Sequence, residues 1–274
     1  MHTLTDTKAK ILMLLEHLKN RDFKPYTLKS TLTPAQEYSD LFVMRADYAR
    51  ATFLAENIYA LLKTSVCSIT HEFRFFNPEG LPIGTNSFHT DKYFSCFELD
   101  PPRASINPDQ PYISFTHSTT LDQEAKDDCY AKGIRPIPLH RGYLRQSKLA
   151  DHMGSVVHGS FGGISPQSYE DNAAKQRRHG FEYMPNYQFN PDFKYDLVFN
   201  NPTDKDLKLT IKSYVKQGSN QLLASLKIAS LGTKYLTISN LEGLITIESR
   251  MPICRPIIFQ NPDLDDSCLN IFHS

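Results

Sequence analysis

Beyond residue 63 the chain is a succession of short runs rich in aromatic and β-branched residues, separated by Asn, Pro, Gly and Asp. Short runs bounded by turn-forming residues are typical of β-strands and hairpins. We therefore expect a mainly β fold of one or two sandwich-like modules, with strands over residues 68–76, 93–99, 112–116, 155–158, 195–199, 207–215, 222–228, 235–239, 245–249 and 257–259.

The first part of the chain has a different pattern, because its apolar residues recur at helical spacing. A Thr5–Asp6–Thr7 sequence suited to helix capping precedes the first group, which is Ile11, Leu14, Leu15 and Leu18. Residues 33–36 combine a capping box with proline at the first helical position, and apolar residues then keep roughly helical spacing to about Lys63. We expect α-helices within residues 1–64.

Two portions of the β region have the same order of elements. The first runs through a strand at 68–76, a turn at 77–80, a second strand, and the segments 91–95 and 112–115; the second runs through 207–214, 217–220, a strand, 233–237 and 245–248. An internal duplication explains this order, and so does the recurrence of similar hairpins in unrelated β proteins. The predicted organisation is a helical segment (1–64), a first β module (65–120), a connecting region with a Gly/His-rich loop (121–191) and a second β module (192–274).

The second portion resembles a known family. The turn at 201–206, the strand ending at 209–211 and the segment 247–253 are similar to the sensory rhodopsin transducer family. The resemblance covers about residues 192–260 and implies a small β-sandwich that assembles into oligomers and acts by binding rather than by catalysis. It implies nothing about the ligand.

Composition limits the partners and the compartment. Thirty Lys and Arg residues balance thirty Asp and Glu residues, so no net field attracts the chain to nucleic acid or to an anionic membrane. No apolar run approaches the ~20 residues of a membrane helix, and no signal peptide is recognisable. Five widely spaced cysteines without a Cys-x-x-Cys pair fit a reducing compartment, so we expect a cytoplasmic protein.

One group of residues has the spacing of an iron site. His89 and Asp91 form a His-x-Asp pair, and His158 could supply a third ligand. Such a triad leaves coordination positions open for 2-oxoglutarate and oxygen, and Arg177 or Arg178 could bind the oxo-acid carboxylate. The segment resembles the phytanoyl-CoA dioxygenase branch of the Fe(II)/2-oxoglutarate oxygenases, although its arginines lie further from His158 than in that pattern. The other interpretation is that these polar residues belong to turns.

The region 140–163 is rich in histidine and glycine. Glycines let the backbone approach a ligand closely, while histidine and arginine can contact anions. A basic cluster and an aromatic run follow at 175–179 and 181–189, and the aromatic run is expected mainly to face a core. The predicted ligand-binding residues are His140, Arg141, His158, Ser160, Arg178 and Tyr183.

These observations predict a non-catalytic binding or assembly protein that forms homo-oligomers and needs no cofactor. Its loops are expected to recognise a small or glycan-like ligand, without nucleic acid or membrane partners. No Gly-x-Ser-x-Gly elbow supports a serine hydrolase. The alternative is a Fe(II)/2-oxoglutarate-dependent oxygenase that uses His89, Asp91 and His158.

Overall fold

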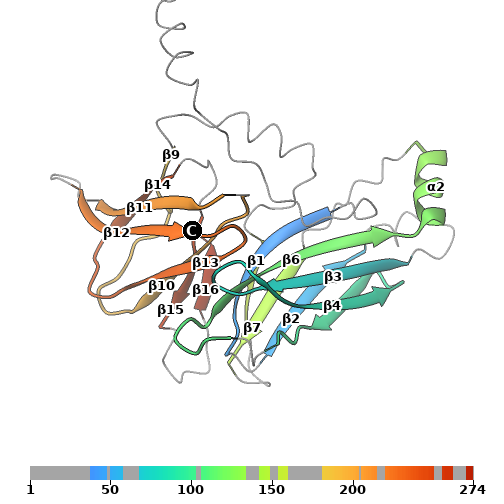
Figure 1. Ribbon diagram of the computed structural model, residues 1–274, viewed down its shortest axis with the longest axis horizontal. Coiled ribbons are helices and arrows are strands. Elements are labelled where there is room, and N and C mark those ends of the chain that lie inside the picture. Colours follow the sequence, from blue (N-terminus) through green and yellow to red (C-terminus); the bar gives the residue numbers. More distant parts are fainter. Residues whose placement is uncertain are drawn as a thin grey trace, which may run out of the picture.

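The computed structural model describes residues 38–47, 50–57, 68–102, 106–133, 142–148, 154–159, 181–203, 205–214, 220–249, 255–261 and 270–273. Their strands form four antiparallel sheets of four strands each, so the fold is mainly β as predicted. Figure 1 shows two groups of strands side by side, one coloured blue to green and the other orange to red. We call them unit one and unit two.

Unit one contains eight strands in two sheets, β1-β6-β3-β4 and β5-β2-β7-β8. The facing sides of these sheets enclose a core rich in phenylalanine, including Phe42, Phe53, Phe73, Phe97 and Phe115. The strands are β1 (Tyr38–Arg45), β2 (Arg50–Glu56), β3 (Ile69–Phe76), β4 (Pro82–Thr90), β5 (Phe94–Glu98), β6 (Tyr112–Leu121), β7 (Tyr143–Ser147) and β8 (Ser155–Val157).

Unit two contains the other eight strands, in the sheets β12-β11-β14-β9 and β13-β10-β15-β16. Its core is more aliphatic and includes Leu197, Leu209, Ile211, Ile247 and Ile258. The strands are β9 (Phe181–Tyr183), β10 (Tyr195–Asn200), β11 (Leu207–Tyr214), β12 (Gln221–Ile228), β13 (Thr233–Ile238), β14 (Leu244–Ser249), β15 (Ile257–Gln260) and β16 (Asn270–His273).

The two units have the same topology. Each strand of unit one has its counterpart eight strands later: β1-β6-β3-β4 corresponds to β9-β14-β11-β12, and β5-β2-β7-β8 corresponds to β13-β10-β15-β16. The four strands that the sequence pattern pairs between the two portions, β3 to β6 with β11 to β14, are equivalent in this arrangement. The predicted repeat of elements is therefore present, and it includes four further strands per unit.

The sheet β13-β10-β15-β16 joins the two units, because its central strands β10 and β15 are buried on both faces. Alternate residues of a strand point to opposite faces. In β10, Tyr195, Leu197 and Phe199 enter the core of unit two, while Val198 packs in the core cluster of unit one. Strand β10 contacts β1, and β13 contacts β6. The edge strands β8 and β16 also lie side by side, where the Ile271 amide donates to Ser155 Oγ at 3.0 Å.

The prediction of a helix from residue 33 to about 63 is wrong over the described residues, because 38–45 and 50–56 form strands β1 and β2. Residues 41–44 are apolar and buried on both faces of their sheet, and a continuous apolar run does not distinguish helix from strand. In β2 the helix-favouring Ala and Leu residues are held by pairing with β5 and β7, and tertiary packing outweighs propensity. The predicted helices before residue 38 lie outside the described residues.

The predicted domain boundaries are also too narrow, because unit one begins with β1 at Tyr38 and includes β7 and β8 from the expected connecting region. That region also supplies β9 to unit two and contains a short helix that the sequence pattern did not predict, α2 (Gln123–Ala131). Within the described part of the chain, no helix is long and apolar enough to cross a membrane.

Candidate functional site

The outward side of the sheet β5-β2-β7-β8 in unit one carries a group of exposed apolar side chains, and we call it the open face. Strand β2 alternates, so that Ala51, Phe53 and Ala55 are buried in the core while Leu54 lies on the opposite side, partly exposed. Leu54 is paired with Cys96 on β5 and with Tyr143 on β7. These three residues form one row across three strands.

Further apolar side chains extend this row. Phe94 lies two residues before Cys96, and Val156 on β8 is paired with Arg145, which shares its face with Tyr143. Their side chains are largely in solvent: Phe94 is 49%, Val156 is 48% and Tyr143 is 43% exposed. Exposed aromatic side chains grouped on a sheet mark interaction surfaces more often than single apolar residues do.

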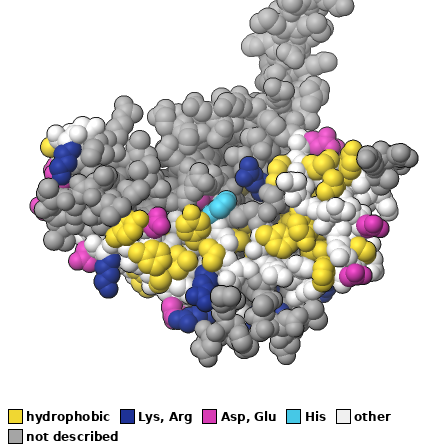
Figure 2. Space-filling view, turned by 180° about the vertical axis from the view of Figure 1, so that it is seen from behind, with side chains coloured by type: hydrophobic (Ala, Val, Ile, Leu, Met, Phe, Trp, Pro, Cys, Tyr) yellow, Lys and Arg dark blue, Asp and Glu magenta, His cyan; other side chains and the backbone are white. Residues whose placement is uncertain are grey.

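Charged residues of both signs surround the apolar row. Glu56 and Arg50 stand at the two ends of β2, and an exposed ion pair joins Arg50 to Glu98 on β5. Figure 2, the view from behind, shows hydrophobic side chains gathered in groups with Lys, Arg, Asp and Glu side chains around them. An apolar centre with a polar rim is the usual composition of a protein–protein interface.

The equivalent face of unit two is buried inside the molecule. Its central row is Tyr235–Val198–Ile257, which matches Cys96–Leu54–Tyr143 in strand order. Val198 is fully buried, and the Tyr235 ring lies 5.0 Å from the ring of Tyr112 on β6. Unit one therefore covers in unit two the face whose counterpart in unit one is exposed at Phe94, Tyr143 and Val156.

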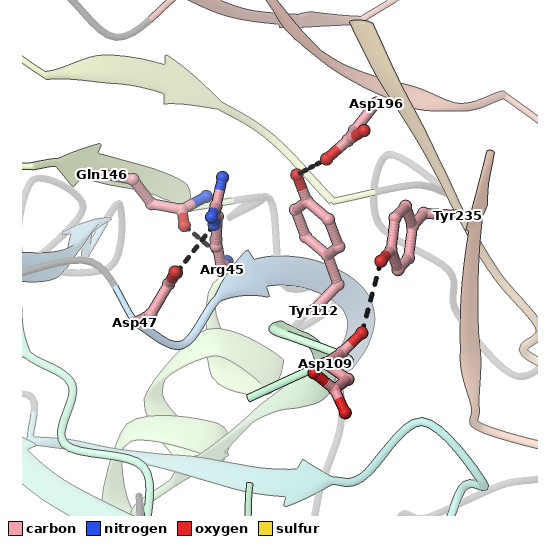
Figure 3. Close-up of polar contacts among 7 residues, drawn as sticks. All are labelled: Arg45, Asp47, Asp109, Tyr112, Gln146, Asp196 and Tyr235. Carbon is pink, nitrogen blue, oxygen red and sulfur yellow. Dashed lines mark hydrogen bonds and ion pairs between the residues drawn. The ribbon is translucent and has the colours of Figure 1, made fainter. Parts of the chain in front are cut away.

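A polar network holds this junction together (Figure 3). The Tyr112 hydroxyl donates to the buried carboxylate of Asp196 at 2.6 Å, and the Thr237 hydroxyl donates to the other carboxylate oxygen at 2.7 Å. The guanidinium of Arg45 lies 5.7 Å from the centre of the Tyr112 ring and pairs with Asp47 at 2.8 Å. Two hydroxyl donors compensate the burial of one carboxylate, so this network stabilises the contact between the units.

Turns of the two units also meet at the junction. Gly80, in the turn after β3, has φ of +77°, and a Cβ atom there would overlap the carbonyl oxygen of Ser230. The Thr233 amide donates to the Pro78 carbonyl oxygen at 3.1 Å, and the Thr233 hydroxyl donates to the Tyr112 carbonyl oxygen at 2.9 Å. Glycine at position 80 is needed both for the backbone conformation and for this close approach.

A shallow depression of about 500 Å³ lies beside β4 on unit one. It is lined by Gly84, Thr85, Asn86, Asp100, Pro101 and Pro102. The Asp100 amide donates to Asn86 Oδ1 at 3.1 Å, and Gly84 lets Pro102 approach β4, since a Cβ at position 84 would come within 2.9 Å of the proline ring. Its lining carries amide, carboxylate and hydroxyl groups, from Asn86, Asp100 and Thr85.

The structure does not bring the three predicted iron ligands together. His89 lies on β4, near the hydroxyls of Ser68 and Thr70, and Asp91 follows the same strand. His158 follows β8, next to Gly159, which contacts Asp40 on β1. Strands β4 and β1 are opposite edges of one sheet, three strand spacings or ~14 Å apart, whereas ligands of one ion lie within ~2 Å of it. Among the described residues, no three His, Cys, Asp or Glu side chains are arranged to share a metal ion.

Two of the six predicted ligand-binding residues are described. His158 Nδ1 donates to the Gly159 carbonyl oxygen at 2.9 Å in unit one, and Tyr183 on β9 packs against the core of unit two. His140, Arg141, Ser160 and Arg178 lie outside the described residues, as do Arg177 and the basic cluster. A ligand site formed by these six residues stays a prediction.

The aromatic run faces the core of unit two, as expected. Phe189 and Tyr195 are buried, and their rings pack edge to face with centres 5.0 Å apart. The Tyr187 hydroxyl donates to the Tyr195 hydroxyl at 3.2 Å. Burial, together with this hydrogen bond, raises the pKa of Tyr187 above the ordinary tyrosine value, so the phenol stays protonated.

A buried histidine pair in unit one was not anticipated from the sequence. His71 Nδ1 and His117 Nε2 are 3.0 Å apart, so one imidazole donates to the other inside the aromatic core. The His117 ring stacks on Phe73 with centres 4.9 Å apart. The sequence indicates the burial of His71, because this residue alternates in phase with Ile69, Phe73 and Phe75 on the same face of its strand.

No family model matches the chain, and no curated protein is significantly similar to it in sequence.

Proposed function

We propose that this protein is a non-catalytic assembly protein, in which two firmly joined β-sandwiches present one sheet face for association with other copies of the chain. The observation that carries the proposal is the open face, where Phe94, Val156 and Tyr143 are each more than two-fifths exposed beside Leu54. Apolar surface that leaves water on association stabilises a complex by about 25 cal/mol per Å². A rigid scaffold is suited to holding such a surface in shape.

Two further observations support a binding role. The likeness of residues 192–260 to the sensory rhodopsin transducer family points to a sandwich that forms oligomers and binds. The ionisable groups at the junction also pair with one another, since Arg45 pairs with Asp47 and Asp196 accepts from Tyr112. Their arrangement favours a structural role for these groups.

We further propose that the protein recognises a small, hydroxyl-rich ligand of the glycan type in the cytoplasm. The depression beside β4 supports this ligand class, because Asn86, Asp100 and Thr85 offer hydrogen-bonding groups in a space of about 500 Å³. The exposed free thiol of Cys96 fits a reducing compartment.

The test of the assembly function is the molar mass of the full chain, measured by size-exclusion chromatography with light scattering from low micromolar to the highest attainable concentration. An oligomer whose population increases with concentration is expected, and a monomer at every concentration would refute the assembly function. A thermal-shift panel of sugars and nucleotide sugars tests the ligand class. The expected shift is abolished by Asn86→Ala and retained in Asn190→Ala, a matched control because each asparagine accepts from one backbone amide. The absence of any shift would reject a glycan-like ligand.

A further inference from the structure

We infer that the open face is the self-association surface and that two copies meet there through the same face, related by a two-fold axis. This inference rests on the proposed assembly function and adds the interface and its symmetry. The comparison between units provides the first argument. In unit two the equivalent row, centred on Val198, is covered by β1 and β6 of unit one. A second copy would cover the row centred on Leu54.

The two-fold arrangement follows from what is already buried. Inside the molecule, the surface that covers the Val198 row includes Tyr112 and Ser114, which point out of unit one. Both side chains are buried by unit two, so a second copy cannot offer this surface to the open face. A contact between the open faces of two copies requires no surface that is buried inside the molecule. Because both copies bury the same face, the assembly stops at a dimer.

The charges on β2 favour one orientation of the axis. Arg50 and Glu56 stand at opposite ends of the strand, with Thr52 and Leu54 between them on the same face. An axis that lies in the interface and crosses the strands reverses the strand direction of the second copy. With the axis midway between these ends, each Glu56 faces an Arg50 and each Leu54 faces a Thr52 of the second copy. An axis parallel to the strands would instead place like charges opposite each other, which is unfavourable.

The size of the face predicts a weak dimer. Four strands spaced ~4.8 Å apart, with about five residues per strand, cover roughly 20 by 17 Å. This footprint is smaller than the ~800 Å² per partner that standard interfaces bury. The dimer should therefore dissociate on dilution, which makes its affinity measurable.

The test is a Phe94→Lys/Tyr143→Lys double variant, with Leu222→Lys as the matched control. All three side chains are exposed, and Leu222 lies on β12 of unit two. In light scattering and sedimentation we expect the double variant to dimerise about tenfold more weakly or worse, because it removes two aromatic anchors. The control should dimerise like the wild type, and circular dichroism should report a native fold for both variants.

The native thiol of Cys96 gives a second readout without mutation. Mass-spectrometric mapping of maleimide labelling should show slower modification of Cys96 at high protein concentration, where the dimer forms. A wild-type chain that is monomeric at every concentration overturns the proposed function. An oligomer that the double variant leaves unchanged, with labelling of Cys96 independent of concentration, overturns this inference and leaves the assembly function standing.

Discussion

The two equivalent sheet faces of the molecule have opposite environments. Val198 on β10 and Leu54 on β2 occupy the same place in the same topology, at the centre of a row across three strands. Val198 is fully buried against unit one, and Leu54 is partly exposed. Both faces also carry charge: Asp196 on the buried face accepts from two hydroxyls, whereas Arg50, Glu56 and Glu98 on the open face are exposed. The difference teaches that covering a face, rather than its topology, decides how its charged side chains are satisfied.

The largest test of this comparison introduces the same charge at both positions. We expect Val198→Asp to lower the free energy of unfolding by about 3–5 kcal/mol, because it buries a carboxylate between two cores. Leu54→Asp should cost about 1 kcal/mol or less, since the new carboxylate can reach water. Urea unfolding of both variants at low protein concentration measures the difference.

If Val198→Asp prevents folding, Val198→Thr provides the measurement, because it keeps the side-chain shape and buries one hydroxyl. Its cost should be about 1–3 kcal/mol. Equal losses at positions 198 and 54 would mean that the open face is covered within the monomer, and the contrast between the faces would be wrong.

A smaller loss should follow from removing one donor at the junction. Tyr112→Phe deletes the hydroxyl that donates to the buried Asp196 carboxylate at 2.6 Å, so we expect a loss of about 1.5–3 kcal/mol. Tyr235→Phe is the matched control, because its hydroxyl donates at 3.3 Å to an exposed carbonyl oxygen of Asp109 and should contribute about 0.5 kcal/mol. Thermal unfolding that ranks the two variants in the opposite order would show that the Tyr112–Asp196 bond does not join the units.

The cores of the two units can be compared through the histidine pair. By strand register, His71 and His117 of unit one correspond to Leu209 and Ile247 of unit two. Either His71→Leu or His117→Ile alone should cost about 1–3 kcal/mol, because it separates a buried hydrogen-bonded pair. The double variant copies unit two and should cost less than the sum of the single variants, with a coupling of about 1 kcal/mol. A double-mutant cycle in urea measures the coupling, and strictly additive losses would contradict it.

Part of this fold could be predicted from the sequence because local chemistry specifies it. The turn between β3 and β4 is an example: Asn77 Oδ1 accepts from the Glu79 amide at 3.1 Å and from the Leu81 amide at 2.8 Å, and Gly80 has a positive φ. Asparagine and glycine at such positions predict a chain reversal. The strands on either side of the turn alternate in burial or exposure, so the side of each strand that faces the core could be predicted as well.

The open face and the junction could not be predicted, because both depend on partners distant in sequence. Tyr112 and Asp196 are 84 residues apart, and nothing near either residue specifies the other. Leu54 and Val198 are both apolar residues on outward-facing positions, so only the arrangement of the units distinguishes them. Strand β1 was missed for a related reason, since burial on both faces removes the alternation that identifies a strand.

The smallest effect concerns the segment between β9 and β10 of unit two, which contains an aromatic cluster. The equivalent segment of unit one, between β1 and β2, is short. Tyr187 packs 4.6 Å from the Phe272 ring, and burial raises its pKa. A raised folded-state pKa means that the stabilisation is complete below the unfolded-state pKa of about 10 and is lost as the pH rises above it. We expect the wild type to lose stability above pH ~10 by less than the ~1.4 kcal/mol per pH unit that one proton allows, since Tyr187 is partly solvated. Above pH ~10, the free energy of unfolding measured in urea should fall less steeply with pH in Tyr187→Phe than in the wild type. Tyr214→Phe, at an exposed position, is the control and should keep the wild-type slope. Equal slopes for the wild type and Tyr187→Phe would contradict the burial of the Tyr187 phenol.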